Sequence, residues 1–279
     1  MRAWLLILVV LAACGCAPVA APAPVDATPR TVYVRDAAAL IASPPARGAL
    51  LARAARHDLT AVAPYGLGPL LADPAGRAQV AAWIAELHRA GVAVVVPVAG
   101  TDRVAALVAL VDASPGVWLD GVVTELEYWN QAARADGLVA LEATLDALRA
   151  AGPRLAPGHD LRVGAYLGYP TAAEAAELAT RLDFVFLDYS VASPAEAWRH
   201  VHPRGGALRD RFAWFARAGV EVWPIFYAAG EVDMRAALVR VGEAGVEARF
   251  RADLAADPDY HDLAIAGFCY FTLEALPAP

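Results

Sequence analysis

The chain has 279 residues, a formal net charge of −7 and 58 % hydrophobic residues, and its Lys and Arg positions are all arginine. The negative charge argues against nucleic acid as a partner, because the chain has no excess of cations to neutralise phosphates. The absence of lysine excludes Schiff-base and pyridoxal phosphate chemistry and the phosphate loop of nucleotide hydrolases. We therefore expect no cofactor.

Residues 1–13 have the pattern of an export signal. Arg2 supplies a positive charge, and an uncharged apolar run extends over residues 4–13. That run is shorter than the ~20 residues that cross a bilayer, as in a signal peptide. It ends in Leu11-Ala12-Ala13-Cys14, which resembles the lipobox of bacterial lipoproteins. The resemblance implies a secreted protein held on the cell envelope by a lipid on Cys14, and Gly15 is compatible with the outer membrane. An ordinary signal peptide that contains a cysteine is the alternative.

Residues 14–30 are rich in alanine and proline and predict an extended tether. Cys16 lies in this tether and Cys269 lies in an apolar segment, so a disulfide framework is not expected. The remainder, residues 31–279, has about 250 residues, which is the usual size of one (β/α)₈ barrel.

Short apolar runs alternate with amphipathic segments through residues 31–279, as in a parallel sheet covered by helices. The predicted strands are 31–35, 59–63, 93–98, 121–127, 162–166, 184–188, 221–227 and 265–271. The predicted helices are 46–56, 77–90, 103–113, 138–151, 172–182, 208–218 and 234–254. Several helices end near a glycine that accepts a left-handed conformation, such as Gly91 and Gly219.

Eight parallel strands with right-handed crossovers close into a barrel, so we expect an α/β (β/α)₈ TIM barrel. An open, doubly wound sheet is the structural alternative. No glycine-rich turn follows the first predicted strand, and this disfavours the open sheet.

The active site of such a barrel lies at the carboxyl ends of its strands. The fourth strand reads LDGVVTELEYWN over residues 119–130, and Asn130 is the chain's sole asparagine. Because side chains alternate along a strand, Glu125 and Glu127 point to the same side, ~7 Å apart at their α-carbons. Burial and mutual repulsion raise carboxyl pKa values, so one of the two can remain protonated near neutral pH and act as a general acid. The alternative is a solvated strand end whose carboxylates pair with arginine.

The segment from Asp120 to Tyr128, DGVVTELEY, resembles the strand-four signature D-G-x-D-x-D-x-E-Y of glycoside hydrolase family 18, the chitinase and endo-N-acetylglucosaminidase family. Weaker matches follow the family's order. They are PVAG at residues 97–100, PIFYA at residues 224–228 and GFCYF at residues 267–271.

This resemblance implies that Glu127 is the catalytic acid and that Asp120 is the first, structural Asp of the signature. It places Glu125 where the family has the Asp that orients the substrate's N-acetyl group. Val123 replaces the inner Asp, so the proton shuttle behind the acid is altered or missing. Retaining and inverting routes with a second carboxylate stay open.

Polar and aromatic residues at the predicted strand ends complete the expected glycan site, because sugar rings stack on aromatic faces. The candidate binding residues are Tyr65, Trp129, Asn130, Tyr166, Asp188, Tyr189, Tyr227, Tyr270 and Phe271.

His200, His202 and His261 lack supporting metal-ligand spacing, so no metal is expected. Two functions remain. The first is a glycoside hydrolase of the cell envelope with a glycan substrate. The second is a non-catalytic, lectin-like barrel that binds carbohydrate, which the loss of the inner Asp at Val123 favours.

Overall fold

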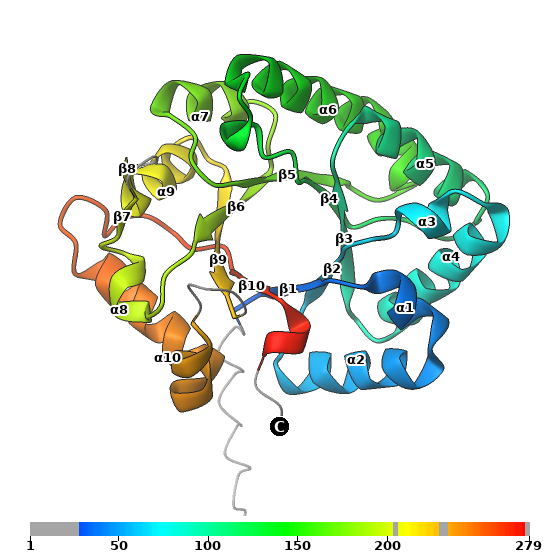
Figure 1. Ribbon diagram of the computed structural model, residues 1–279, viewed down its shortest axis with the longest axis horizontal. Helices are drawn as coiled ribbons and strands as arrows, with labels where there is room; N and C mark the ends of the chain where they lie inside the picture. Colours follow the sequence, from blue (N-terminus) through cyan, green and yellow to red (C-terminus); the bar gives the residue numbers. More distant parts are fainter. Residues whose placement is uncertain (1–27, 203–205, 229–233, 277–279) are drawn as a thin grey trace, which may run out of the picture.

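The protein forms a closed barrel of parallel strands surrounded by helices, in a computed structural model that describes residues 28–202, 206–228 and 234–276 (Figure 1). The predicted signal, most of the predicted tether, Cys14 and Cys16 lie outside the described residues.

The barrel strands are hydrogen-bonded in the order β1-β10-β9-β6-β5-β4-β3-β2, and β1 pairs with both β2 and β10. This closure confirms the predicted (β/α)₈ barrel and excludes the open sheet. The strands are β1 (Arg30–Val34), β2 (Ala61–Pro64), β3 (Ala93–Val98), β4 (Gly121–Thr124), β5 (Arg162–Leu167), β6 (Phe184–Tyr189), β9 (Glu221–Tyr227) and β10 (Phe268–Phe271). Each predicted strand is present, with ends that differ by up to three residues.

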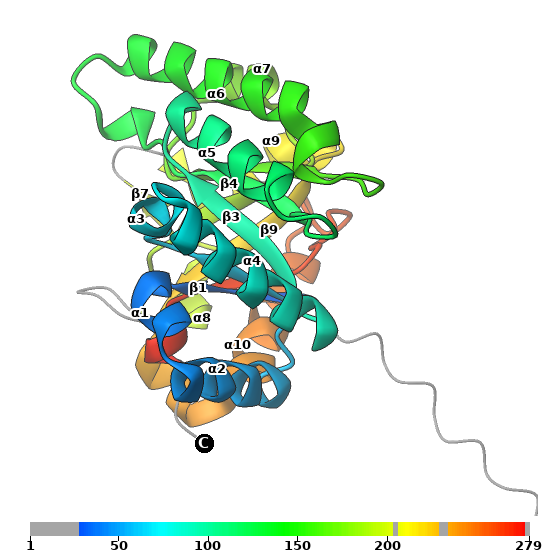
Figure 2. The ribbon, with the colours of Figure 1, turned by 90° about the vertical axis from the view of Figure 1, so that its right-hand side faces the viewer.

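The outer layer contains a helix for each predicted one. These are α2 (Pro44–Arg56), α4 (Pro74–Arg89), α5 (Thr101–Asp112), α6 (Arg134–Leu155), α7 (Ala172–Ala179), α9 (Leu208–Arg217) and α10 (Arg235–Ala255). In the view turned by 90°, the strands lie between α5 and α6 on one side and α2 and α10 on the other (Figure 2). Among the described helices, none has both the length and the apolar character needed to cross a membrane.

Short elements in the connecting segments were not predicted, because they are too short to show a periodic pattern. They are α1 (Ala37–Ala42), α3 (Gly68–Leu71), α8 (Pro194–Ala197), the hairpin of β7 (Val201–His202) and β8 (Gly206–Ala207), and the 3₁₀ turns η1 (Tyr128–Asn130) and η2 (Leu273–Ala275).

Local sequence signals explain where several helices begin and end. Asp73 precedes α4 and accepts hydrogen bonds from two backbone amides of its first turn. Thr171 and Glu174 form a capping box at the start of α7. Gly91 and Gly219 have φ values of 74° and 81°, which confirms their predicted left-handed conformation after α4 and α9.

Aromatic rings occupy part of the amino-terminal half of the barrel interior. Gly164 on β5 leaves room for one of them, since a Cβ atom there would lie 2.3 Å from the ring of Phe184. Trp223 fills the corresponding space beside Gly267. On the amino-terminal side of these rings, Arg162 and Glu221 form an ion pair at 2.6 Å. A cavity of about 270 Å³ remains at this end, lined by Phe184 and Trp223 among others. A separate cavity lies at the carboxyl ends of the strands.

Candidate active site

A cavity of about 350 Å³ opens at the carboxyl ends of the barrel strands. It lies at the end where barrels of this type carry their chemistry. Its volume is at the small end of the ~300–1,000 Å³ typical of ligand pockets. The residues that line it are Tyr33, Arg35, Tyr65, Glu125, Glu127, Tyr166, Ile225, Tyr227 and Phe271. Both predicted glutamates and four of the predicted aromatic residues therefore meet in one cavity.

Strand β4 ends earlier than predicted, at Thr124 instead of at residue 127. Its neighbour β3 ends at Val98, and the amide of Glu125 makes the last bond to it, donating to the Val98 carbonyl at 2.7 Å. Glu125 therefore keeps the inward direction that the strand pattern predicts. Glu127 has φ −76° and ψ 63°, the geometry of an inverse γ-turn. A turn, and not strand alternation, brings Glu127 to the cavity.

Glu125 lies at the base of the cavity and is partly buried. The hydroxyl of Tyr33, itself completely buried, donates a hydrogen bond to Glu125 Oε1. Burial raises the pKa of Glu125, the Tyr33 hydrogen bond lowers it, and repulsion from Glu127 raises it further, to about 8 overall. Glu125 therefore carries a proton at neutral pH. No arginine contributes to this shift.

Glu127 lies at the rim of the cavity and is exposed to solvent. Its Oε2 accepts a hydrogen bond of 2.7 Å from Nδ2 of Asn130, in the 3₁₀ turn η1. Asn130 therefore belongs to the site as a partner of Glu127 and does not line the cavity itself. The two carboxyl groups thus differ in their surroundings, since Glu125 is partly buried beside Tyr33 and Glu127 is exposed to water.

Two tyrosines form the wall beside the glutamates. The hydroxyls of Tyr166 and Tyr227 are 2.9 Å apart and hydrogen-bonded. Trp129 packs edge-on behind Tyr166 and is 8 % exposed, so it supports the wall without reaching the cavity. Asp188 is buried nearby and accepts a hydrogen bond of 2.6 Å from Ser190. Burial, followed by the negative charge of Asp188, raises the pKa of both tyrosines, so their hydroxyls remain neutral.

The structure does not bring Tyr189 and Tyr270 to the cavity, and their prediction as binding residues is corrected here. The Tyr189 hydroxyl donates to the carbonyl of Leu208 in the helical layer. The Tyr270 hydroxyl donates to Glu247 of α10 at 2.6 Å. The reason is the alternation of strands: Asp188 and Phe271 face inward, so the residue beside each faces the helices.

Asp120 lies at the opposite end of β4, apart from the two glutamates. Its Oδ2 accepts a hydrogen bond of 2.8 Å from the amide of Val94 and lies 2.7 Å from Nε2 of His88 on α4. Asp120 thus joins β3, β4 and α4 and takes no part in the cavity. The prediction of Asp120 as a catalytic residue is therefore corrected. The structural role that the family resemblance implies for Asp120 agrees with these contacts.

Sequence reasoning missed Tyr33, Arg35 and Ile225. The signal for the first two was available, because the predicted first strand alternates Thr31, Tyr33 and Arg35 on one face. The importance of Tyr33 was not visible, since its contact with Glu125 joins residues 92 positions apart in the sequence.

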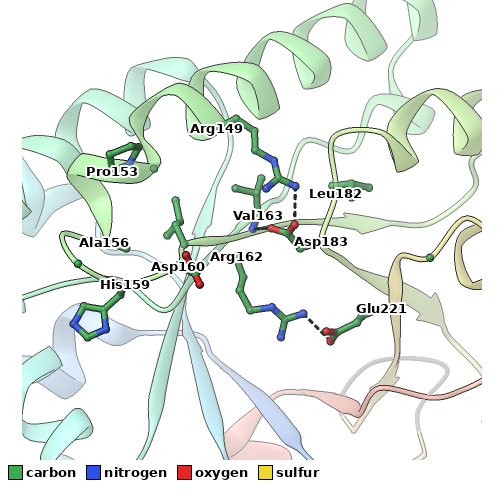
Figure 3. Close-up of a pocket in the computed structure, with 14 residues that line it drawn as sticks. Arg149, Pro153, Ala156, His159, Asp160, Arg162, Val163, Leu182, Asp183 and Glu221 are labelled. Carbon is green, nitrogen blue, oxygen red and sulfur yellow. Dashed lines mark hydrogen bonds and ion pairs between the residues drawn. The ribbon is translucent and has the colours of Figure 1, made fainter.

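A larger recess, of about 960 Å³, lies at the amino-terminal ends of β5, β6 and β9 (Figure 3). Four of the charged groups labelled there form two ion pairs. Arg149 pairs with Asp183 at 2.9 Å, and Arg162 pairs with Glu221 at 2.6 Å. In barrels of this type this end serves stability. The smaller cavity with the glutamates is therefore the candidate active site.

Among the described residues, no group of three His, Cys, Asp or Glu side chains is placed to hold a metal ion.

No family model matches the sequence, and no curated protein matches it. Solved structures match its fold. A GH18 chitinase from Pseudoalteromonas aurantia aligns with 87 % of this chain and 93 % of its own, at 14 % identity and a TM-score of 0.51. GH5_18 from Streptomyces cattleya, in complex with GlcNAc, aligns with 88 % of this chain and 70 % of its own, at 15 % identity and a TM-score of 0.58. Beta-glucosidase 2 from the fungus Trichoderma reesei aligns with 88 % of this chain and 89 % of its own, at 11 % identity and a TM-score of 0.53. At these identities the likeness shows the barrel fold alone.

Proposed function

We propose that this protein is a glycoside hydrolase whose carboxyl pair is Glu125 and Glu127. One observation carries the proposal: a partly buried carboxyl group with a raised pKa and a solvent-facing one meet in a tyrosine-walled cavity at the carboxyl ends of the barrel strands. Hydrolysis of a glycosidic bond needs two such groups, an acid for the leaving oxygen and a carboxylate for the sugar or the attacking water. The barrel of three solved glycoside hydrolases supports it at the level of fold.

We assign the proton donor to Glu125. The family resemblance implied Glu127 for this role, but Glu125 is the group whose burial keeps a proton on it near pH 7. The Tyr33 hydroxyl donates to Oε1, which leaves Oε2 of Glu125 to carry the proton toward the cavity. Glu127, held by Asn130 at the rim and open to water, is then the second carboxylate. It activates water or attacks the sugar.

The test is hydrolysis of a panel of 4-nitrophenyl glycosides and oligosaccharides by the wild-type protein and by Glu125→Gln and Glu127→Gln. Each substitution keeps the shape of the side chain and removes its acid chemistry. We expect turnover to fall at least a hundredfold in both variants, since general acid catalysis contributes ~10²–10⁴-fold, while glycan binding is retained. Undiminished turnover in either variant would rule the pair out.

A carbohydrate-binding protein without turnover is the second candidate function. Its support is Val123, which is completely buried directly below Glu125 and supplies no polar group to pass a proton. Glycans that bind the wild-type protein and yield no product on prolonged incubation would favour this function over hydrolysis.

We also propose that the chain is a lipoprotein of the cell envelope, anchored through Cys14. The support is the lipobox-like segment and the tether that follows it. The described chain enters the barrel at Arg30, at the amino-terminal end of β1, whereas the cavity lies at the carboxyl ends. Incorporation of labelled palmitate into the wild-type chain and not into Cys14→Ser tests this proposal.

A further inference from the structure

A second, apolar recess of about 230 Å³ adjoins the candidate active site. It lies under the segment 65–71, between the end of β3 and the first turn of α5. Tyr65 and Glu125 line both spaces, so the recess leads away from the glutamates behind the Tyr65 ring. Its walls include Leu71, Val98 and Leu107, and its charged groups are Glu125 and Arg103.

Arg103 is not committed to a strong ion pair. The nearest carboxylate is that of its neighbour Asp102, at 3.5 Å, and the Asp102 side chain is 78 % exposed. The guanidinium instead lies against Gly68, where a Cβ atom would be 2.7 Å from Nη1. A cation in the first turn of a helix also gains nothing from the helix dipole. The Arg103 side chain is 48 % exposed, so its guanidinium faces solvent as well as the recess that it lines.

A second arginine stands on the other side of Tyr65. Arg35 lines the tyrosine-walled cavity, and it takes part in no ion pair found among the described residues. The adjacent Asp36 is engaged in capping α1, with its Oδ1 bonded to the Ala39 amide. In a chain with a net charge of −7, two such cations bordering one pair of cavities indicate a negatively charged ligand.

We propose that the glycan carries a carboxylate-bearing substituent, with its sugar ring in the tyrosine-walled cavity and its carboxylate at Arg103 in the apolar recess. The carbon atoms of the substituent would contact the apolar walls, and Arg35 would add a second positive charge on the side of the ring. This inference rests on the proposed function, because it names the substrate class of the same site.

The carboxyl group of Glu125, which lines both spaces, does not repel such a ligand at neutral pH. Burial raises the pKa of Glu125 to about 8, so Glu125 is uncharged there and does not repel a carboxylate passing beside it. The negative charge nearest Arg103 is then the Asp102 carboxylate, at 3.5 Å and largely exposed to water, which screens it.

The experiment compares two sugars that differ by one acidic group, N-acetylmuramic acid and N-acetylglucosamine, which lacks the 3-O-lactyl ether. Glucuronic acid and glucose form a second pair. Dissociation constants are measured by NMR titration on the wild-type protein. We expect the acid of at least one pair to bind about ten- to a hundredfold more tightly, as for a charged hydrogen bond, and we expect the preference to shrink as salt is raised.

Three variants locate the preference. Arg103→Gln is expected to abolish it and to leave the affinity for the neutral sugar unchanged. Gly68→Ala keeps the charge but moves the guanidinium, so it should weaken the preference. Arg56→Gln, an exposed arginine of α2 that lines neither space, removes the same charge elsewhere and should have no effect.

Equal affinities for the acid and neutral members of both pairs, no measurable binding of either acid, or an unchanged preference in Arg103→Gln would each overturn the inference. Its failure is distinguishable from that of the proposed function. A preference that depends on Arg103, with no hydrolysis of any glycan, supports acidic-sugar binding and removes the hydrolase. Hydrolysis of glycans without any preference for the acidic sugar supports the hydrolase and overturns the acidic-sugar inference.

Discussion

The hydroxyl of Tyr33, which is buried, donates a hydrogen bond to Oε1 of Glu125, which is partly buried at the base of the cavity. Tyr33 itself stays protonated, because burial, and next the negative charge of Glu125, raise its pKa well above the usual value. The bond connects β1 to the end of β4 across the barrel interior. It fixes the orientation of the carboxyl group, and it limits how far burial raises the pKa of that group.

This contact predicts the alkaline limb of the pH profile. If Glu125 donates the proton, turnover is present below a pH of about 8 and is lost as the pH rises through that value. In Tyr33→Phe the bond that favours the ionised carboxylate is missing, so the pKa of Glu125 rises and the limb moves to higher pH. The measurement is kcat against pH for the two proteins. A limb that stays in place, or that moves to lower pH, would contradict the role of Glu125.

Glu125 should also make the stability of the fold depend on pH. Its pKa is about 8 in the folded chain and ~4.3 in an unfolded one. Between these values the folded state binds more protons, so the free energy of unfolding falls as the pH rises, by up to ~1.4 kcal/mol per pH unit. Glu125→Gln has no such proton to lose. We therefore expect it to gain stability relative to the wild type from pH 5 to pH 8 in urea denaturation. Parallel curves for the two proteins would be evidence against a neutral, buried Glu125.

Tyr65 and Tyr270 should separate ligand binding from folding. The Tyr65 ring is 47 % exposed and lines both spaces of the site. Tyr65→Ala is expected to weaken glycan binding by ~1–2 kcal/mol with little change in stability. Tyr270→Phe removes the hydrogen bond to buried Glu247 and is expected to cost ~1.5–3 kcal/mol of stability with unchanged affinity. Titrations and thermal melts of both variants check this. A loss of glycan affinity in Tyr270→Phe with unchanged stability would place Tyr270 in the binding site.

Asp120 is predicted to support the barrel and not the reaction. In Asp120→Ala the amide of Val94 and the ring of His88 lose their acceptor, which should cost ~1–3 kcal/mol of stability. Because these contacts lie at the end of β4 far from the cavity, kcat per folded molecule should not change. Denaturation curves and kinetics on the same preparation give both numbers. A selective fall in kcat would restore Asp120 to the catalytic group.

Much of the fold follows from pattern in the sequence. The barrel strands and the long helices were predicted because parallel strands buried on both faces are apolar throughout, and because helices repeat their apolar positions at a different period. The inward direction of Glu125 follows in the same way, since alternation along β4 continues through its bond to Val98. These are local properties, which the residues of one segment determine together.

What the sequence alone could not determine depends on contacts between distant segments. Strand β4 stops at Thr124 because β3 offers no partner beyond its last bond, so Glu127 reaches the cavity through a turn at the rim. The difference between the two glutamates arises from this difference in depth, because Tyr33 and the barrel walls cover much of the Glu125 carboxyl group and leave that of Glu127 exposed. Desolvation is a property of the folded surroundings, and no spacing of residues along the chain encodes it directly.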